Sequence, residues 1–135
     1  VEAAARNGVI LAVGHVERFN PAMDFLEKHA KDTCFVEAHR LACYPPPRPG
    51  LHRRGTEVSV VLDLMIHDID LVLTMIDSEV ERFDVVGIPV LSDTEDLVNA
   101  RIKFRNGACA SLTASCGSCV VCFGVRENHP MATSL

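Results

Sequence analysis

The sequence contains no tryptophan, a single tyrosine and no long uninterrupted apolar run within its 135 residues. A membrane-spanning helix needs about 18–20 consecutive apolar residues. The longest candidate, residues 58–76, is interrupted by Asp63, His67, Asp68 and Asp70. The sequence therefore predicts no membrane span and no membrane partner.

Clustered basic residues are also missing, and the formal net charge is −5. A nucleic-acid-binding surface needs grouped Lys and Arg side chains, so we expect no nucleic-acid partner. The first residues lack the basic-then-apolar layout of a signal peptide. Of the six cysteines, four crowd between Cys109 and Cys122 instead of being spread as a disulfide framework. These features predict a reducing, cytoplasmic location.

The residues that are present indicate one globular domain, since 48% are apolar and 23% are charged. The chain begins at Val1 and not at Met, which suggests a fragment of a longer protein. Glu2–Asn7 has helical character and Gly8 is a natural helix stop, while Val9–Val13 has the pattern of a strand buried on both faces. A doubly wound domain ends with this order, so residues 1–20 are predicted to be the remnant of the end of such a domain.

Residues 21–115 are predicted to form the main folded domain. Asn20 and Pro21 are good residues to begin a helix that runs to about Ala30. The further expected elements are a strand at Cys34–Leu41, a loop at Tyr44–Arg54, a helix at Ser59–Asp77, a strand at Phe83–Val90, and a hairpin of Val98–Phe104 with Ala108–Ala114 around an Asn-Gly turn. This order predicts an α+β fold, in which an open, mainly antiparallel sheet carries its helices on one face.

A polar stripe marks the helix predicted at residues 59–77. At about 100° per residue, Asp63, His67, Asp70 and Thr74 fall within roughly 60° of one another, and nearly every other direction is apolar. Such a helix should be largely buried, so the stripe should face a cleft or a set of partners. A carboxylate one turn before an imidazole suits proton transfer from a hydroxyl. A structural polar network in the core explains the same pattern equally well.

Three segments, Val13–Pro21, Glu37–Arg40 and Val60–Asp70, together carry a family resemblance. They resemble the carboxy-terminal part of the Gfo/Idh/MocA oxidoreductases, the glucose–fructose oxidoreductase and inositol dehydrogenase group, from the start of the chain to about Ser115. Within the family, the pattern looks most like the dehydrogenases of nucleotide sugars, such as those that oxidise UDP-N-acetylglucosamine.

The resemblance implies hydride transfer from a sugar or polyol hydroxyl to NAD or NADP. It also implies that residues 1–20 are the remnant of the end of a Rossmann dinucleotide-binding domain and that residues 21–115 are a substrate and oligomerisation domain. It implies that His67 accepts the hydroxyl proton and that Asp63 is its partner or a substrate anchor. The remaining implied roles are cofactor contacts for Arg18 and His15, and substrate contacts for Asn20, Arg40 and Asp70. The exposed sheet face commonly forms the subunit contact, so a homo-oligomer is implied.

A first departure from the family, the lack of two segments, leaves open whether this chain is itself an enzyme. It contains no G-x-G-x-x-G turn for a dinucleotide and no Glu-Lys-Pro segment, which supplies the family's catalytic lysine. We therefore expect the chain alone to be inactive and to bind NAD(H) negligibly. A non-catalytic binding or assembly domain of the same fold is the alternative.

The second departure is an atypical Cys-rich tail at residues 116–135. Cys116, Cys119 and Cys122 have the spacing of three iron–sulfur ligands, and a fourth ligand would have to be Cys109 or His129. A metal-binding module is therefore a further alternative. Burial of small apolar thiols explains the same residues, so we expect no metal site.

Overall fold

The computed structural model describes residues 1–30, 32–43, 49–50 and 58–117 of the chain. The expected loop at Tyr44–Arg54 lies almost wholly outside these described residues. The elements, in chain order, are α1 (Glu2–Asn7), a 3-10 helix η1 (Val16–Phe19), α2 (Pro21–His29), β1 (Phe35–Ala42), a π-helical turn η2 (Val61–Met65), α3 (Ile66–Met75), β2 (Val80–Ile88), β3 (Leu97–Phe104) and β4 (Cys109–Cys116).

The strands form a single sheet in the order β1-β4-β3-β2. The β2–β3 and β3–β4 pairs are antiparallel, and only β1 runs parallel to its neighbour β4, from Phe35 beside Cys109 to Ala42 beside Cys116. The predicted hairpin joins β3 to β4, and its turn places Gly107 at φ +91°, a left-handed value that glycine adopts without strain. The prediction of an open, mainly antiparallel sheet is confirmed.

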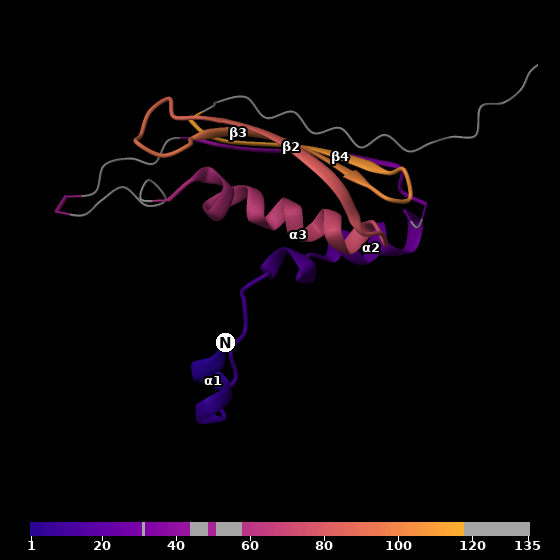
Figure 1. Ribbon diagram of the computed structural model, residues 1–135, viewed down its shortest axis with the longest axis horizontal. Helices are drawn as coiled ribbons and strands as arrows, with labels where there is room; N and C mark the ends of the chain where they lie inside the picture. Colours follow the sequence, from indigo (N-terminus) through magenta and orange to yellow (C-terminus); the bar gives the residue numbers. More distant parts are fainter. Residues whose placement is uncertain (31, 44–48, 51–57, 118–135) are drawn as a thin grey trace, which may run out of the picture.

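The helices η2 and α3 cover one face of this sheet, as Figure 1 shows. Alternate residues of β3 and β4 point toward them because successive strand side chains face opposite sides. The largest fully buried side chains are Phe104, Met65, Leu112, Val72 and Val98. The core is therefore a single layer between one helix and the sheet, which confirms the predicted arrangement.

The helix predicted at residues 59–77 is present, but it differs from the expectation in two respects. Its first turn, Val61–Met65, is π-helical, a rare geometry that is often found at functional sites. The expectation that it is buried on nearly all sides is wrong, because Leu62 is 62% exposed and Leu73 is 49% exposed. The sheet covers only one side of this helix, and apolar residues elsewhere on it remain at the surface.

Local signals set the ends of the short helices as predicted. The Asn20 side chain accepts a hydrogen bond from the backbone N–H of Ala22, and Pro21 begins α2. Gly8, at φ 61°, ends α1. Both ends follow from the residues themselves and need no tertiary partner.

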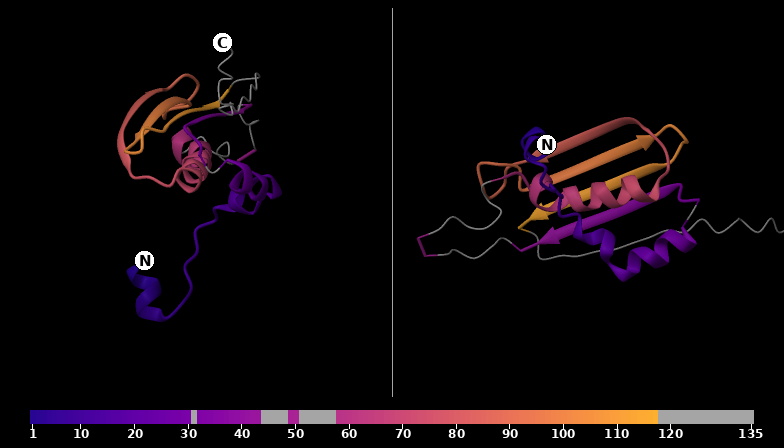
Figure 2. Two further views of the ribbon diagram at one scale, coloured as in Figure 1. Left: turned by 90° about the vertical axis from the view of Figure 1, so that its right-hand side faces the viewer. Right: turned by 90° about the horizontal axis from the view of Figure 1, so that it is seen from below.

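The strand predicted at Val9–Val13 does not form. This segment has no regular secondary structure, and Ile10 is 97% exposed. Figures 1 and 2 show that α1 and the extended segment lie away from the sheet and its helices. A strand requires a neighbour for its N–H and C=O groups, and none of the described strands lies beside residues 9–13.

A buried carboxylate organises the connection between β2 and β3. One oxygen of Asp96 accepts hydrogen bonds from three consecutive backbone N–H groups, those of Val90, Leu91 and Ser92, at 2.6, 2.5 and 3.1 Å. Although burial opposes ionisation, these hydrogen bonds hold the pKa of Asp96 below its ordinary value. The connection at residues 90–96 is thus built around a charged group.

Candidate active site

His67 is the second residue of α3 and the centre of the candidate site. Its imidazole is half-buried, and its Nδ1 atom is buried without a hydrogen-bond partner among the described residues. A buried polar atom without a partner is costly and therefore uncommon in folded proteins. His67 thus has an unused hydrogen-bonding atom next to the other polar residues of α3.

Asp70, one turn after His67, is held by two residues from the segment that precedes α2. The Arg18 guanidinium donates to both Asp70 oxygens, with Nε at 2.7 Å from Oδ2, and the Nδ1 of His15 lies 3.4 Å from Oδ2. The hydrogen bond from Arg18 lowers the pKa of the Asp70 carboxyl, against the effect of burial. Positive charge on His15 and His67 acts in the same direction as Arg18. The structure thereby brings together four predicted site residues.

A second network joins Arg40 of β1 to Asp68 of α3 and to Glu17 of η1. Arg40 donates from Nε and Nη2 to the two oxygens of Asp68 at 2.9 and 2.7 Å, and its Nη1 lies 3.3 Å from Glu17 Oε1. Neither Asp68 nor Glu17 was predicted as a site residue from the sequence. The signal for both is their place in the chain, since Asp68 directly follows His67 and Glu17 directly precedes Arg18.

Asp63 is not hydrogen-bonded to His67. It lies in the π-helical turn η2 and forms no hydrogen bond or ion pair with His67 in the part of the chain that the structure describes. Instead, its charge acts on the thiol of Cys116 at the end of β4. The expected carboxylate–imidazole pair is therefore not a direct contact, and the carboxylate whose charge is coupled to His67 is Asp70.

Two other predicted substrate residues use their side chains within the fold. Asn20 caps α2 through its Oδ1 atom, and Arg40 is engaged by Asp68 and Glu17. Thr74, the last residue of the predicted stripe, donates its hydroxyl to the backbone carbonyl of Asp70. Because these side chains already form hydrogen bonds within the fold, each has fewer hydrogen-bonding atoms left for a bound molecule.

The cysteine cluster falls largely outside the described residues, because Cys119 and Cys122 both lie there. Cys116 is half-buried, and burial, followed by the charges of Asp63 and Asp96, raises the pKa of its thiol. Within residues 1–30, 32–43, 49–50 and 58–117, no group of three His, Cys, Asp or Glu side chains is arranged to hold a metal ion.

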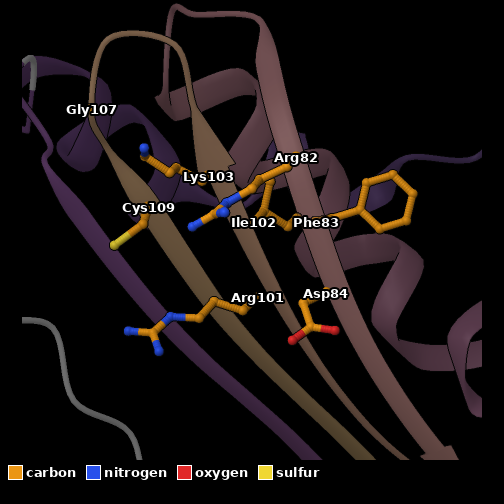
Figure 3. A pocket seen from close by; sticks show the side chains of 8 residues that line it. All are labelled: Arg82, Phe83, Asp84, Arg101, Ile102, Lys103, Gly107 and Cys109. Atoms are coloured by element: carbon orange, nitrogen blue, oxygen red, sulfur yellow. The ribbon is translucent and has the colours of Figure 1, made fainter.

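The sheet face opposite α3 carries a shallow depression of about 650 Å³. Figure 3 shows cationic side chains of β2 and β3 projecting in front of the strands, with α3 behind them. The residues that line the depression are Arg82, Phe83, Asp84, Arg101, Ile102, Lys103, Gly107 and Cys109. This polar outer face is separated by the sheet from His67 and Asp70.

None of the helices in the described ranges has the length and apolar character that crossing a membrane requires.

Comparison with known proteins gives consistent matches. The model of the GFO/IDH/MocA C-terminal domain matches residues 32–120. UDP-N-acetylglucosamine 3-dehydrogenase of Acidithiobacillus ferrooxidans is 34% identical over 113 residues, which cover 83% of this chain and 34% of that enzyme. The chain therefore spans about a third of the length of this relative.

Solved structures share the fold. A structure of the same Acidithiobacillus ferrooxidans enzyme has a TM-score of 0.71 at 33% identity, over 85% of this chain and 36% of that one. Scyllo-inositol dehydrogenase from Lactobacillus casei, solved with NAD(H) and scyllo-inositol, has a TM-score of 0.62 at 14% identity, over 87% of this chain and 38% of that one. At this identity the second likeness concerns the fold alone.

Proposed function

This chain belongs to the GFO/IDH/MocA family as its C-terminal domain, and on that premise we propose that it is the substrate-binding and proton-accepting part of an NAD(P)-dependent oxidoreductase. The reaction is oxidation of a hydroxyl on a sugar, polyol or nucleotide sugar. Because the relative at 34% identity is a UDP-N-acetylglucosamine dehydrogenase, a nucleotide sugar is the substrate class we put first. In this proposal residues 21–115 form the substrate-binding and proton-accepting domain. Residues 1–20 are the amino-terminal remnant, and residues 116–135 are the tail.

The observation that supports this role is the unpartnered, buried Nδ1 of His67 next to the ionised Asp70. Oxidation of a hydroxyl requires a base that removes the O–H proton as the C–H hydride leaves. A neutral imidazole can do so, and a nearby carboxylate stabilises the imidazolium that forms. His67 is the base in this proposal, and Asp63 anchors the substrate one turn earlier on the same helix. Asp70 supplies the neighbouring negative charge.

The residues present do not fit a dinucleotide by themselves. The sequence has no glycine-rich turn, and Arg18 is bound to Asp70 instead of being available to a phosphate. In this proposal NAD or NADP is held by a separate Rossmann-type unit. His15 and Arg18 lie where that unit meets the domain described here. The chain alone then binds NAD(H) negligibly, and calorimetric titration that detects micromolar binding would contradict this part.

A hybrid enzyme tests the catalytic role. The matched third of the Acidithiobacillus ferrooxidans dehydrogenase is replaced by this chain, and reduction of NAD⁺ is followed with UDP-N-acetylglucosamine as substrate. We expect turnover, and a loss of about 10²–10⁴-fold in kcat for His67→Ala, which is the usual contribution of a general base. A folded hybrid without turnover, or full turnover in His67→Ala, would favour the non-catalytic alternative.

His39 provides the matched control for that substitution. It lies on β1 beside Thr113, and its Nε2 is 3.5 Å from Glu37. Val36 and Ala38 pack against the core, so the alternation of strand side chains places His39 on the opposite sheet face from His67. His39→Ala removes the same imidazole without touching the site, and its kcat should equal that of the unmodified hybrid.

We also propose that the outer sheet face, which carries the depression of Figure 3, is the surface of a homo-oligomer. A two-fold axis through this face would bring the same side chains together from both copies. Arg101→Glu, a substitution of one of the lining residues, should shift the chain toward monomer in sedimentation experiments. Arg105→Glu is the control, because Arg105 lies in the hairpin turn and pairs with Glu79. An unchanged sedimentation coefficient for Arg101→Glu would argue against this interface.

A cytoplasmic location is part of the same proposal. The four cysteines of the described residues, Cys34, Cys43, Cys109 and Cys116, are all free thiols. Free thiols persist in reducing compartments. Fractionation of the producing cells would test the location directly.

A further inference from the structure

The 3-10 helix η1 is attached to the rest of the domain by two arginine–carboxylate pairs that use its adjacent residues Glu17 and Arg18. Glu17 binds Arg40 of β1, and Arg18 binds Asp70 of α3. We propose that Arg40 is a positioning residue, which binds Glu17 and Asp68 at once and so holds η1 where Arg18 and His15 reach Asp70. The proposal rests on the proposed function only in that Asp70 lies beside the base His67.

Packing alone does not hold η1 in place. None of its four residues is buried, and no side chain caps its first turn. The Arg18 side chain is 51% exposed, although the Asp70 side chain that it binds is only 10% exposed. Glu17, the neighbour of Arg18 in η1, gives the same short helix a second attachment through Arg40.

Arg40 is suited to hold two carboxylates together. Asp68 is only 8% exposed, so its charge must be compensated, and the fork of Nε and Nη2 binds both of its oxygens. The remaining Nη1 then points to Glu17 at 3.3 Å. A lysine has one compact charged group and cannot present these separate donors in a fixed plane.

The position of η1 decides the electrostatic surroundings of Asp70. Arg18 and His15 face Asp70 from this segment, and His67 faces it from α3 itself. If η1 moved away, burial would still raise the pKa of Asp70, but the hydrogen bond from Arg18 that lowers this pKa would be lost. The pKa of the Asp70 carboxyl would then rise toward or beyond its ordinary value, and with it the charge beside His67 would change.

The test uses the full chain and nuclear magnetic resonance of two groups, the Nε–H of Arg18 and the carboxyl of Asp70. In Arg40→Gln we expect the Arg18 Nε–H to exchange with solvent about tenfold faster or more. A tenfold change corresponds to a weakening of the attachment of η1 by about 1.4 kcal/mol. We also expect the Asp70 titration to move upward in pH. Arg40→Lys should restore only part of both signals.

Two further variants keep the proposal open to refutation. Glu17→Ala leaves the buried Arg40–Asp68 pair intact, so the fold should survive even where Arg40→Gln unfolds. Arg105→Gln removes an exposed arginine that pairs with Glu79 at 3.1 Å and should leave both signals unchanged. If Glu17→Ala, which removes the acceptor of Arg40 Nη1, also leaves Arg18 and Asp70 as they are in the original chain, Arg40 does not position η1 and the proposal is wrong.

These readouts need no turnover, so they separate this proposal from the proposed function. A shifted Asp70 titration together with an inactive hybrid enzyme would support the positioning role and reject the catalytic one. An active hybrid with unresponsive Arg18 and Asp70 signals would do the reverse.

Discussion

Replacing Met65 by alanine should destabilise the domain far more than replacing Leu62, three residues earlier on the same helix. Met65 is 1% exposed in the core against β3 and β4, whereas Leu62 is 62% exposed. In an α-helix at about 100° per residue, two positions three apart lie on the same side. The π-helical turn Val61–Met65 is wider, and each residue turns less, so these two side chains diverge.

The magnitude follows from the burial of the two side chains. Removing a buried methionine side chain costs about 2–5 kcal/mol, depending on how far the surroundings collapse. One side of this helix is open, so we expect about 2–4 kcal/mol for Met65→Ala. For Leu62→Ala we expect less than about 0.5 kcal/mol, as for other surface substitutions.

Urea unfolding of the full chain, followed by circular dichroism, measures both variants. The unfolding midpoint of Met65→Ala should fall while the slope with urea concentration stays constant, since the area exposed on unfolding is nearly unchanged. The corresponding loss in Tm is roughly 10–25 °C for a domain of this size. Equal losses for Met65→Ala and Leu62→Ala would refute the proposed orientation of the helix, and with it the placement of His67.

Three further expectations concern other parts of the domain. Asp96 has a lower pKa in the folded chain than in the unfolded one, so its ionised carboxylate stabilises the fold above about pH 4, and this stabilisation is lost as the pH falls through the folded-state pKa. Asp96→Asn should remove this part of the pH dependence of the free energy of unfolding in urea, and the control Asp93→Asn should not. Iodoacetamide at pH 8 should alkylate the exposed Cys34 faster than Cys116, because burial raises the pKa of the Cys116 thiol, and peptide mapping by mass spectrometry that finds the opposite order would contradict its placement. Gly107→Ala should cost about 1 kcal/mol in urea unfolding, since its φ of +91° strains any residue with a Cβ; an unchanged midpoint would show that the turn adopts another conformation.

The sequence predicted the elements whose causes are local. Asn20 and Pro21 begin α2, and Gly107 turns the β3–β4 hairpin, because capping and positive φ values depend on a few adjacent residues. It also predicted the long helix with His67, through the spacing of its polar residues. The π-helical turn was not predictable, since nothing in residues 61–65 departs from an ordinary helical pattern.

The candidate site was predicted in part. The residues His15, Arg18, His67 and Asp70 do come together in the folded chain. The direct pairing of Asp63 with His67 was expected from helical spacing, and the structure contains no such contact among its described residues. The spacing of residues along a helix predicts which of them lie on the same face. It does not predict which side chains from other elements bind to that face.

The sequence by itself determined where helices, turns and most strands lie and which helix carries the polar residues, because those properties depend on contacts within a few positions along the chain. Only the tertiary structure decided that β1 pairs in parallel with β4, that Arg40 binds Asp68 and Glu17, and that Val9–Val13 is not a strand. Each of these depends on which partner from a distant part of the chain is within reach to satisfy a charge or a backbone group.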